Sequence, residues 1–304
     1  MKPPDHKILV TGSTGFLGRL LTRRLLADGY AVRCMVRRAA AGVPDGAELV
    51  RADMLEPATL VQALAGIDTA FYLVHAMSAG RAGFERRDRE AAENFVAAAG
   101  KAGVRRVIYL GGLGETGDDL SEHLRSRLEV AEILKRGRFA TTFLRAAIIL
   151  GAGGASFEMV RCLVNRLPVM IVPRWVTTRC QPIAVDDVID YLAGCLADER
   201  TTGRTFDIGG PEVLTYQEMM ERFGRIEGRN LLILPVPVLT PKLSSYWVGL
   251  ITPVPPSLSM PLIEGLKNEV VCRENTIREI LPIRLTPYDE AVRKALAAES
   301  ADKT

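Results

Sequence analysis

The chain has 304 residues, enough for one large domain or for a main domain with a smaller lobe. Its 39 basic and 36 acidic residues are spread along the chain and leave a formal net charge of only +3, which disfavours nucleic-acid binding. Hydrophobic residues make up 48% and charged residues 25% of the chain, which excludes the disordered and collagen-like classes.

In the N-terminal half, short apolar runs alternate with longer segments of helical period. The runs predict strands at 8–11, 31–36, 48–51, 69–74, 107–110 and 142–144. The helical segments lie at 17–27, 58–65, 86–102 and 122–135, each followed by a glycine. Because the runs are apolar on both faces, we expect helices on both sides of them. This pattern predicts an α/β fold, a doubly wound parallel Rossmann sheet.

The alternation breaks down after Gly151. Helices are predicted at 157–167, 187–196, 217–226 and 287–298. We therefore predict a dinucleotide-binding Rossmann domain over 1–155 and a smaller C-terminal substrate or partner lobe over 156–304, with segments around 177–210 returning to the Rossmann domain. The proline-rich apolar stretch 231–266 offers a surface for a membrane or a protein partner, or a lid over the cofactor cleft.

The cysteines and histidines are scattered. The five cysteines form no CxxC pair, and no secretory signal precedes them, so we expect a reducing, cytoplasmic setting, with peripheral membrane contact as an open alternative. Cys162, Cys180 and Cys195 have no basic partner visible in the sequence, which argues against a thiolate nucleophile. The histidines His6, His75 and His123 lack ligand spacing, so we expect no metal site. The oligomeric state stays open.

A glycine-rich segment, TGSTGFLG at 11–18, lies between the first predicted strand and the first predicted helix. In this GxxGxxG pattern, Gly12 permits a tight turn, Gly15 lets the backbone approach a pyrophosphate, and Gly18 lets the helix pack closely on the strand. The N–H groups of the first helical turn then face the phosphates. We predict a dinucleotide site at Gly12, Ser13, Thr14, Gly15, Phe16, Leu17 and Gly18. The alternative is a structural turn.

Residues after the second and third strands bear on the choice of cofactor. Sites that prefer NAD usually place a carboxylate after the second strand, whereas this chain has Arg37 and Arg38. Guanidinium groups bind a 2′-phosphate well, so we predict NADP(H) in preference to NAD(H). The alternative is a solvated basic strand end. After the third strand, Asp53 and Met54 are predicted to line the adenine site, with Asp53 otherwise serving as a turn cap.

Taken together, these motifs resemble the extended and atypical short-chain dehydrogenase/reductase superfamily, especially its NAD(P)H-binding branch of NmrA-like and complex I 39-kDa-subunit-like proteins. The resemblance covers most of the chain through TGSTGFLG at 11–18, RADM at 51–54, YLVHAM at 72–77, VIYLGGLG at 107–114, QPIAVDDV at 181–188 and FDIGGPEVLTYQEM at 206–219. It implies that His75, Gly111 and Gly112 also line the cofactor cleft. The rival interpretation of His75 is a core histidine.

The chain departs from the superfamily at its usual catalytic residues. Gly111 and Gly112 occupy the position of the catalytic serine, and the Tyr-x-x-x-Lys position falls on His123 and Arg127. These two residues are one helical turn apart, and an unperturbed histidine, with a pKa near ~6.5, can exchange a proton at neutral pH. The alternative is a surface helix that carries both by chance.

The resemblance therefore implies an NADPH-dependent oxidoreductase acting on a small or lipophilic carbonyl, enone or quinone. A non-catalytic NADP(H)-binding redox sensor or respiratory-complex assembly protein stays open, because the usual catalytic residues are missing. An NAD-dependent epimerase or dehydratase is a further alternative, weakened by the missing tyrosine.

Overall fold

The computed structural model describes residues 6–38, 42–74, 83–113, 122–167, 169–236 and 268–301. A seven-stranded sheet forms its centre, with the order β11-β6-β5-β4-β1-β2-β3. All neighbouring strands in it are parallel. The strands are β1 (Lys7–Val10), β2 (Ala31–Val36), β3 (Glu48–Arg51), β4 (Thr69–Tyr72), β5 (Arg106–Gly112), β6 (Ala140–Ala146) and β11 (Thr205–Ile208).

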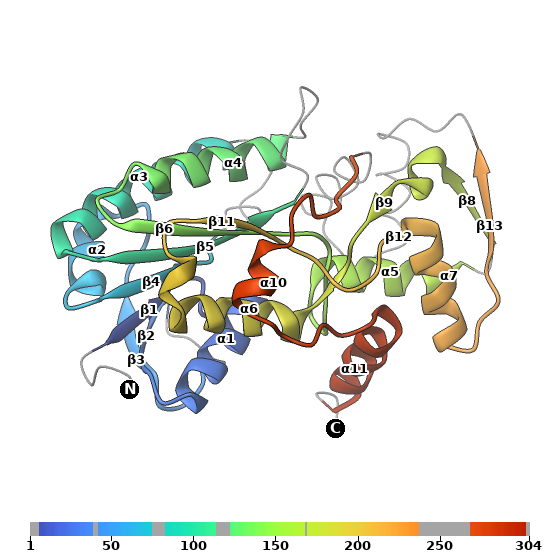
Figure 1. Ribbon diagram of the computed structural model, residues 1–304, viewed down its shortest axis with the longest axis horizontal. Helices are drawn as coiled ribbons and strands as arrows, with labels where there is room; N and C mark the ends of the chain where they lie inside the picture. Colours follow the sequence, from blue (N-terminus) through green and yellow to red (C-terminus); the bar gives the residue numbers. More distant parts are fainter. Residues whose placement is uncertain are drawn as a thin grey trace.

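Helices cover both faces of this sheet (Figure 1). One face packs on α2 (Pro57–Leu64), α3 (Phe84–Ala102) and α4 (Glu122–Lys135). The other packs on α1 (Phe16–Ala27), α6 (Val185–Ala197) and, through Ile277, the short α10 (Thr276–Ile280). The predicted doubly wound Rossmann sheet is confirmed.

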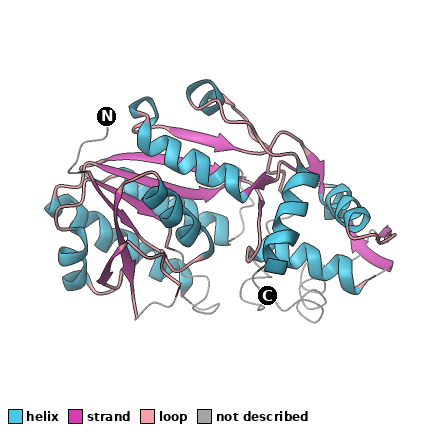
Figure 2. Ribbon diagram, turned by 90° about the horizontal axis from the view of Figure 1, so that it is seen from below, coloured by secondary structure: helices cyan, strands magenta, loops and turns pink. Residues whose placement is uncertain are grey.

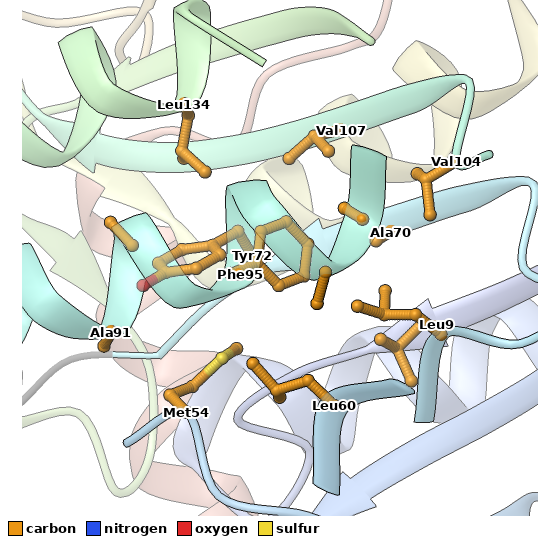
Figure 3. Close-up of a cluster of buried hydrophobic side chains, with 14 of the residues drawn as sticks. Leu9, Met54, Leu60, Ala70, Tyr72, Ala91, Phe95, Val104, Val107 and Leu134 are labelled. Carbon is orange, nitrogen blue, oxygen red and sulfur yellow. The ribbon is translucent and has the colours of Figure 1, made fainter. Parts of the chain in front are cut away.

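Adjacent residues of one strand enter the two different cores. Phe71 lies in the core beneath α1 and α6, whereas Tyr72 lies in the core beneath α2, α3 and α4. The Tyr72 ring meets the Phe95 ring edge to face at 5.1 Å, at the centre of the close-up in Figure 3. Strands apolar on both faces are thus buried on both faces, which is why their positions could be predicted.

The C-terminal part forms its own group of helices and strands beside the main sheet (Figure 2), and its side chains build a separate hydrophobic cluster. Its helices are α5 (Ala155–Arg166), α7 (Tyr216–Ile226) and α11 (Tyr288–Ala301). Short two-stranded pairings complete it: β7 (Ile149–Leu150) with β10 (Ile183–Ala184), β9 (Arg179–Cys180) with β12 (Leu214–Thr215), and β8 (Val169–Pro173) with β13 (Leu232–Val236). Two 3-10 turns lie at η2 (Arg174–Thr177) and η3 (Glu199–Thr201).

The chain crosses between these two parts more than once. After α5 and β8 it returns through α6 to β11, the seventh strand of the main sheet, and then leaves again for α7. The proposed boundary between residues 155 and 156 stays a prediction. Among the described helices, none combines the length and the apolar character needed to cross a membrane.

Candidate cofactor site

The glycine-rich segment lies at the point where the strand order reverses. The chain runs from β1 outward to β3 on one side and from β4 outward on the other, and the carboxyl ends of strands at such a reversal are where open α/β sheets bind ligands. Thr11 joins the two strands at this point: its Oγ1 donates to the Phe71 carbonyl at 3.0 Å and accepts from the Leu73 N–H at 3.0 Å. The loop is therefore held against the end of β4.

Two of the three glycines are required by close backbone contacts. Gly12 has a φ of 65°, and a Cβ there would lie 2.6 Å from the Leu73 carbonyl oxygen. A Cβ on Gly18 would lie 2.1 Å from the Gly12 carbonyl oxygen and 2.8 Å from the Ser13 Cα. The tight packing expected of Gly18 is thus against the loop itself rather than against the strand.

Gly15 opens the loop toward solvent. It precedes α1 with a φ of −77°, is exposed, and donates its N–H to the Gly12 carbonyl at 2.9 Å. Within the described residues, the N–H groups of Thr14, Phe16 and Leu17 have no acceptor. Such unpaired groups at the positive end of a helix fit the diphosphate of a dinucleotide.

Two side chains of the loop make contacts within the protein. Ser13 is buried and its Oγ donates to the Met35 carbonyl at 3.0 Å, which ties the loop to β2. The Phe16 ring lies beside the segment before α5, since a Cβ on Gly151 would be 2.9 Å from its Cζ and one on Gly154 would be 3.0 Å from its Cε1. Ser13 and Phe16 can therefore offer a ligand their main chain.

Arg37 and Arg38 follow the last residue of β2 and are both exposed. No hydrogen bond or ion pair joins either side chain to another described residue. The Ser13–Met35 hydrogen bond brings this strand end beside the phosphate loop. The two guanidinium groups consequently lie on the side where the adenosine half of a dinucleotide would extend.

Asp53 acts as a turn cap in the structure. Its Oδ1 accepts from the Leu55 N–H at 2.9 Å, and its own N–H donates to Thr59 Oγ1 at 3.0 Å. Met54 is buried, and its carbonyl accepts from Asn94 Nδ2 of α3 at 2.9 Å. Contact of Asp53 and Met54 with adenine stays a prediction.

The carboxyl end of β5 is fastened to α4 by Arg127. Arg127 Nη2 donates to the Leu110 carbonyl at 3.1 Å, and the Arg127 carbonyl accepts from the Tyr109 hydroxyl at 3.2 Å. The Nε atom of Arg127 is buried and has no partner in the described part of the chain. A guanidinium thus reaches the strand end that carries Gly111 and Gly112.

The structure brings together the glycine loop, the end of β2, the end of β5 and Arg127. His123 lies in α4 one turn before Arg127, but its side chain is outside the described residues. His75 falls in the segment 75–82, which is also outside them. Their predicted roles stay predictions.

Sequence reasoning missed a buried ion pair beside this site. Arg145 of β6 lies opposite Gly111 of β5, and its Nε donates to Asp207 Oδ1 of β11 at 2.7 Å. The Asp207 side chain is fully buried, and its Oδ2 accepts from the Arg273 N–H at 2.9 Å. The sequence feature that could have indicated this pair is Arg145, a single charged residue inside the apolar run at 143–150.

The buried thiols are poor nucleophiles. Burial raises the pKa of Cys34, which lies beneath the glycine loop near Thr22. Burial also raises the pKa of Cys180 to about 12 and that of Cys195 to about 11. Thiolate chemistry at neutral pH is therefore disfavoured at these three cysteines.

The N-terminal half of the chain matches a known protein family. Residues 12–151 match the family described as NAD(P)H-binding. They form an NAD(P)H-binding domain. The match begins at Gly12 of the phosphate loop and extends past the end of β7. The predicted NAD(P)H-binding character of this half of the chain is confirmed by that match.

Two curated relatives extend beyond this domain. The photosystem II assembly factor Ycf39 of Cyanophora paradoxa is 28% identical over 241 residues, covering 76% of this chain and 72% of the relative. The chloroplastic divinyl chlorophyllide a 8-vinyl-reductase of Arabidopsis thaliana is 25% identical over 258 residues, covering 78% of this chain. The alignment spans 61% of that reductase, less than two thirds of its length.

A solved structure agrees over nearly the whole chain. The triphenylmethane reductase of Citrobacter sp., complexed with NADP(H), superposes with a TM-score of 0.77. The match covers 95% of this chain and 99% of the reductase at 20% sequence identity. This likeness supports the fold of both the NAD(P)H-binding domain and the C-terminal part.

Proposed function

We propose that the protein is an NADPH-dependent reductase that delivers hydride to a small or lipophilic acceptor, such as a carbonyl compound, an enone or a quinone. The observation that carries the proposal is the pairing of an anion cradle at the start of α1 with the exposed Arg37 at the end of β2. The names of two similar proteins support it, because one is a vinyl reductase and the other a triphenylmethane reductase.

Different residues of the site would bind different parts of the cofactor. The N–H groups of Thr14, Phe16 and Leu17 would hold the diphosphate, and the open face of Gly15 leaves room for it. Arg37 and Arg38 would hold the 2′-phosphate through charge-assisted hydrogen bonds. Bound NADPH supplies the hydride.

The end of β5 is where this chain would act on the acceptor. Gly111 and Gly112 carry no side chain, so a flat conjugated molecule can approach the backbone there. Arg127 takes the position of the usual lysine and keeps a positive charge at this strand end. His123, one helical turn earlier, would donate the proton that completes the reduction of a carbonyl.

Steady-state NADPH oxidation tests the proposal against a panel of quinones, enones and aldehydes. We expect turnover with at least one conjugated acceptor, and a loss of about 10²-fold or more in kcat for carbonyl substrates in His123→Ala. His6→Ala is the matched control, since His6 contacts Thr69 and Asp68 at the amino end of the sheet. Equal kcat in His123→Ala and wild type would remove His123 from the mechanism.

A non-catalytic NADP(H)-binding protein is the second candidate. It is favoured by the glycines at the serine position and by the similarity to Ycf39, an assembly factor. Tight NADPH binding without turnover on any panel member would support it and contradict the reductase.

A further inference from the structure

Among the described residues, the pairing of β8 with β13 leaves one apolar face exposed. Val169 of β8 and Leu232 and Leu234 of β13 are 50%, 53% and 45% exposed. Their neighbours Met170 and Ile233 point the other way, into the core with α5 and α7. The register pairs Leu232 with Val169, so the exposed side chains share what we call the outer face.

An uncovered face of this kind is unusual for a parallel pairing. Parallel strands normally have both faces buried, because their side chains are apolar on both. Strands β8 and β13 also lie at the edge of the C-terminal part, far from α2 and α3, as Figure 1 shows. Exposed aliphatic side chains gathered in one place indicate a contact surface.

The surroundings of the outer face are basic. No acidic residue occurs in the windows 159–185 and 228–263, which contain β8 and β13. Arg166, Arg225 and Arg229 are exposed at the ends of α5 and α7, where the two strands begin. Arg229 Nη1 donates to the Asn165 carbonyl at 3.1 Å, which holds its guanidinium at the end of α5. Glu227 is the one carboxylate in the same turn.

The strands themselves disfavour a protein partner that would extend the sheet. Pro235 lies within β13 and Pro173 ends β8. Proline has no N–H to donate to an added strand, and prolines on edge strands oppose pairing with another chain. Aliphatic side chains with a basic rim instead match a bilayer, in which leucine enters the acyl boundary and arginine meets the headgroup phosphates.

We propose that the outer face of β8 and β13 docks on an anionic lipid surface. The apolar contacts come from Val169, Leu232 and Leu234, and the charge contacts come from Arg225 and Arg229. This inference does not depend on the proposed reductase, because it concerns binding alone.

Vesicle co-sedimentation of the full chain tests it. One set of vesicles contains phosphatidylcholine with about one third phosphatidylglycerol, and the other contains phosphatidylcholine alone. We expect the protein to pellet with the anionic vesicles, to bind the neutral ones less, and to be released as salt is raised.

Two variants remove the two kinds of contact. Leu232→Ser with Leu234→Ser should lower the partition coefficient by about tenfold or more, because two half-exposed leucines no longer enter the lipid. Arg225→Gln with Arg229→Gln should lower it by about fivefold for each charge. If the variant with both Arg225→Gln and Arg229→Gln shows no thermal unfolding transition, the single variant Arg225→Gln is tested in its place.

Matched controls lie on the other side of the molecule. Leu49→Ser with Val61→Ser removes two side chains that are 52% and 61% exposed, and Lys101→Gln removes an exposed charge on α3. These variants should pellet like the wild type. The proposal is overturned if wild-type protein stays in the supernatant with anionic vesicles, or if the controls lose as much binding. It is equally overturned if sedimentation velocity shows a dimer that Leu232→Ser with Leu234→Ser dissociates.

Discussion

Replacing Gly18 by alanine tests the geometry on which the cofactor site depends. A Cβ at this position would lie 2.1 Å from the Gly12 carbonyl oxygen and 2.8 Å from both the Gly12 carbonyl carbon and the Ser13 Cα. All three are backbone atoms, so no side-chain rotation relieves the contact. The loop would have to retreat from α1 by roughly 1 Å to restore a normal separation.

That movement should lower both the unfolding free energy and the affinity for NADPH. Overpacking of this kind destabilises a protein by about 1–3 kcal/mol, so the unfolding free energy without cofactor should fall by that amount. The displaced loop also carries the N–H groups of the anion cradle. Losing one hydrogen bond to a charged phosphate corresponds to about 1.5–3 kcal/mol, so NADPH should bind about tenfold or more weakly.

Gly15→Ala is the matched comparison. Gly15 has a φ of −77°, and its Cβ would meet only the Gly12 carbonyl oxygen, at 3.1 Å. Stability without cofactor should therefore stay within about 0.5 kcal/mol of the wild type. Binding should still weaken, since the added methyl group occupies the exposed face where the diphosphate would lie.

Urea unfolding without cofactor and fluorescence titration with NADPH separate the two effects. If Gly18→Ala unfolds at the wild-type urea concentration, the loop is not packed against α1 as described. If Gly15→Ala binds NADPH as tightly as the wild type, the diphosphate does not lie over Gly15, and the assignment of the cradle is wrong.

Three further predictions address charge. Arg37→Ala should weaken NADPH binding by about 1.5–3 kcal/mol and spare NADH, as parallel fluorescence titrations would show; equal losses for both cofactors would refute the 2′-phosphate assignment. Arg145→Met leaves the fully buried Asp207 carboxylate unpaired and should cost about 3–5 kcal/mol in urea unfolding. Thr215→Ala removes the capping box of α7 and should cost about 1 kcal/mol at neutral pH. The main-chain N–H and the hydroxyl of Thr215 both donate to the Glu218 carboxylate and lower its pKa, and alanine loses only the hydroxyl. The hydroxyl's share of the difference should therefore be lost as the pH falls through that lowered pKa; a difference that is constant down to acid pH would contradict it.

The parts of the fold that were predictable share one physical cause. Strands β1, β2, β4, β5 and β6 are buried on both faces, so each leaves an apolar run with a recognisable position. The strands that were missed leave no such apolar run. β13 contains Pro235 and exposes alternate residues, and β11 carries the charged Asp207 in its centre. The sequence around both strands is polar or proline-rich, so neither forms a distinct apolar run.

Within the candidate site, main-chain features were predicted better than side-chain features. The positions of Gly12, Gly15 and Gly18 indicated the loop, but the buried hydrogen bond from Ser13 to Met35 joins residues 22 apart and leaves no local pattern. Likewise, Asp53 offered two roles in the sequence, and only the structure shows its Oδ1 bonded to Leu55.

This difference between main-chain and side-chain features explains why the class of cofactor is easier to predict from the sequence than the proposed hydride acceptor. A diphosphate is bound by main-chain N–H groups, and the glycines that expose them lie within eight consecutive residues. The surroundings of Gly111 instead come from distant segments: Arg127 from α4, Arg145 from β6 and Asp207 from β11. Because Asp207 also binds the Arg273 main chain, the C-terminal segment is fixed to the same strand end as the proposed acceptor site. In the proposed reductase, selection of the acceptor would therefore depend on side chains that only the topology brings together.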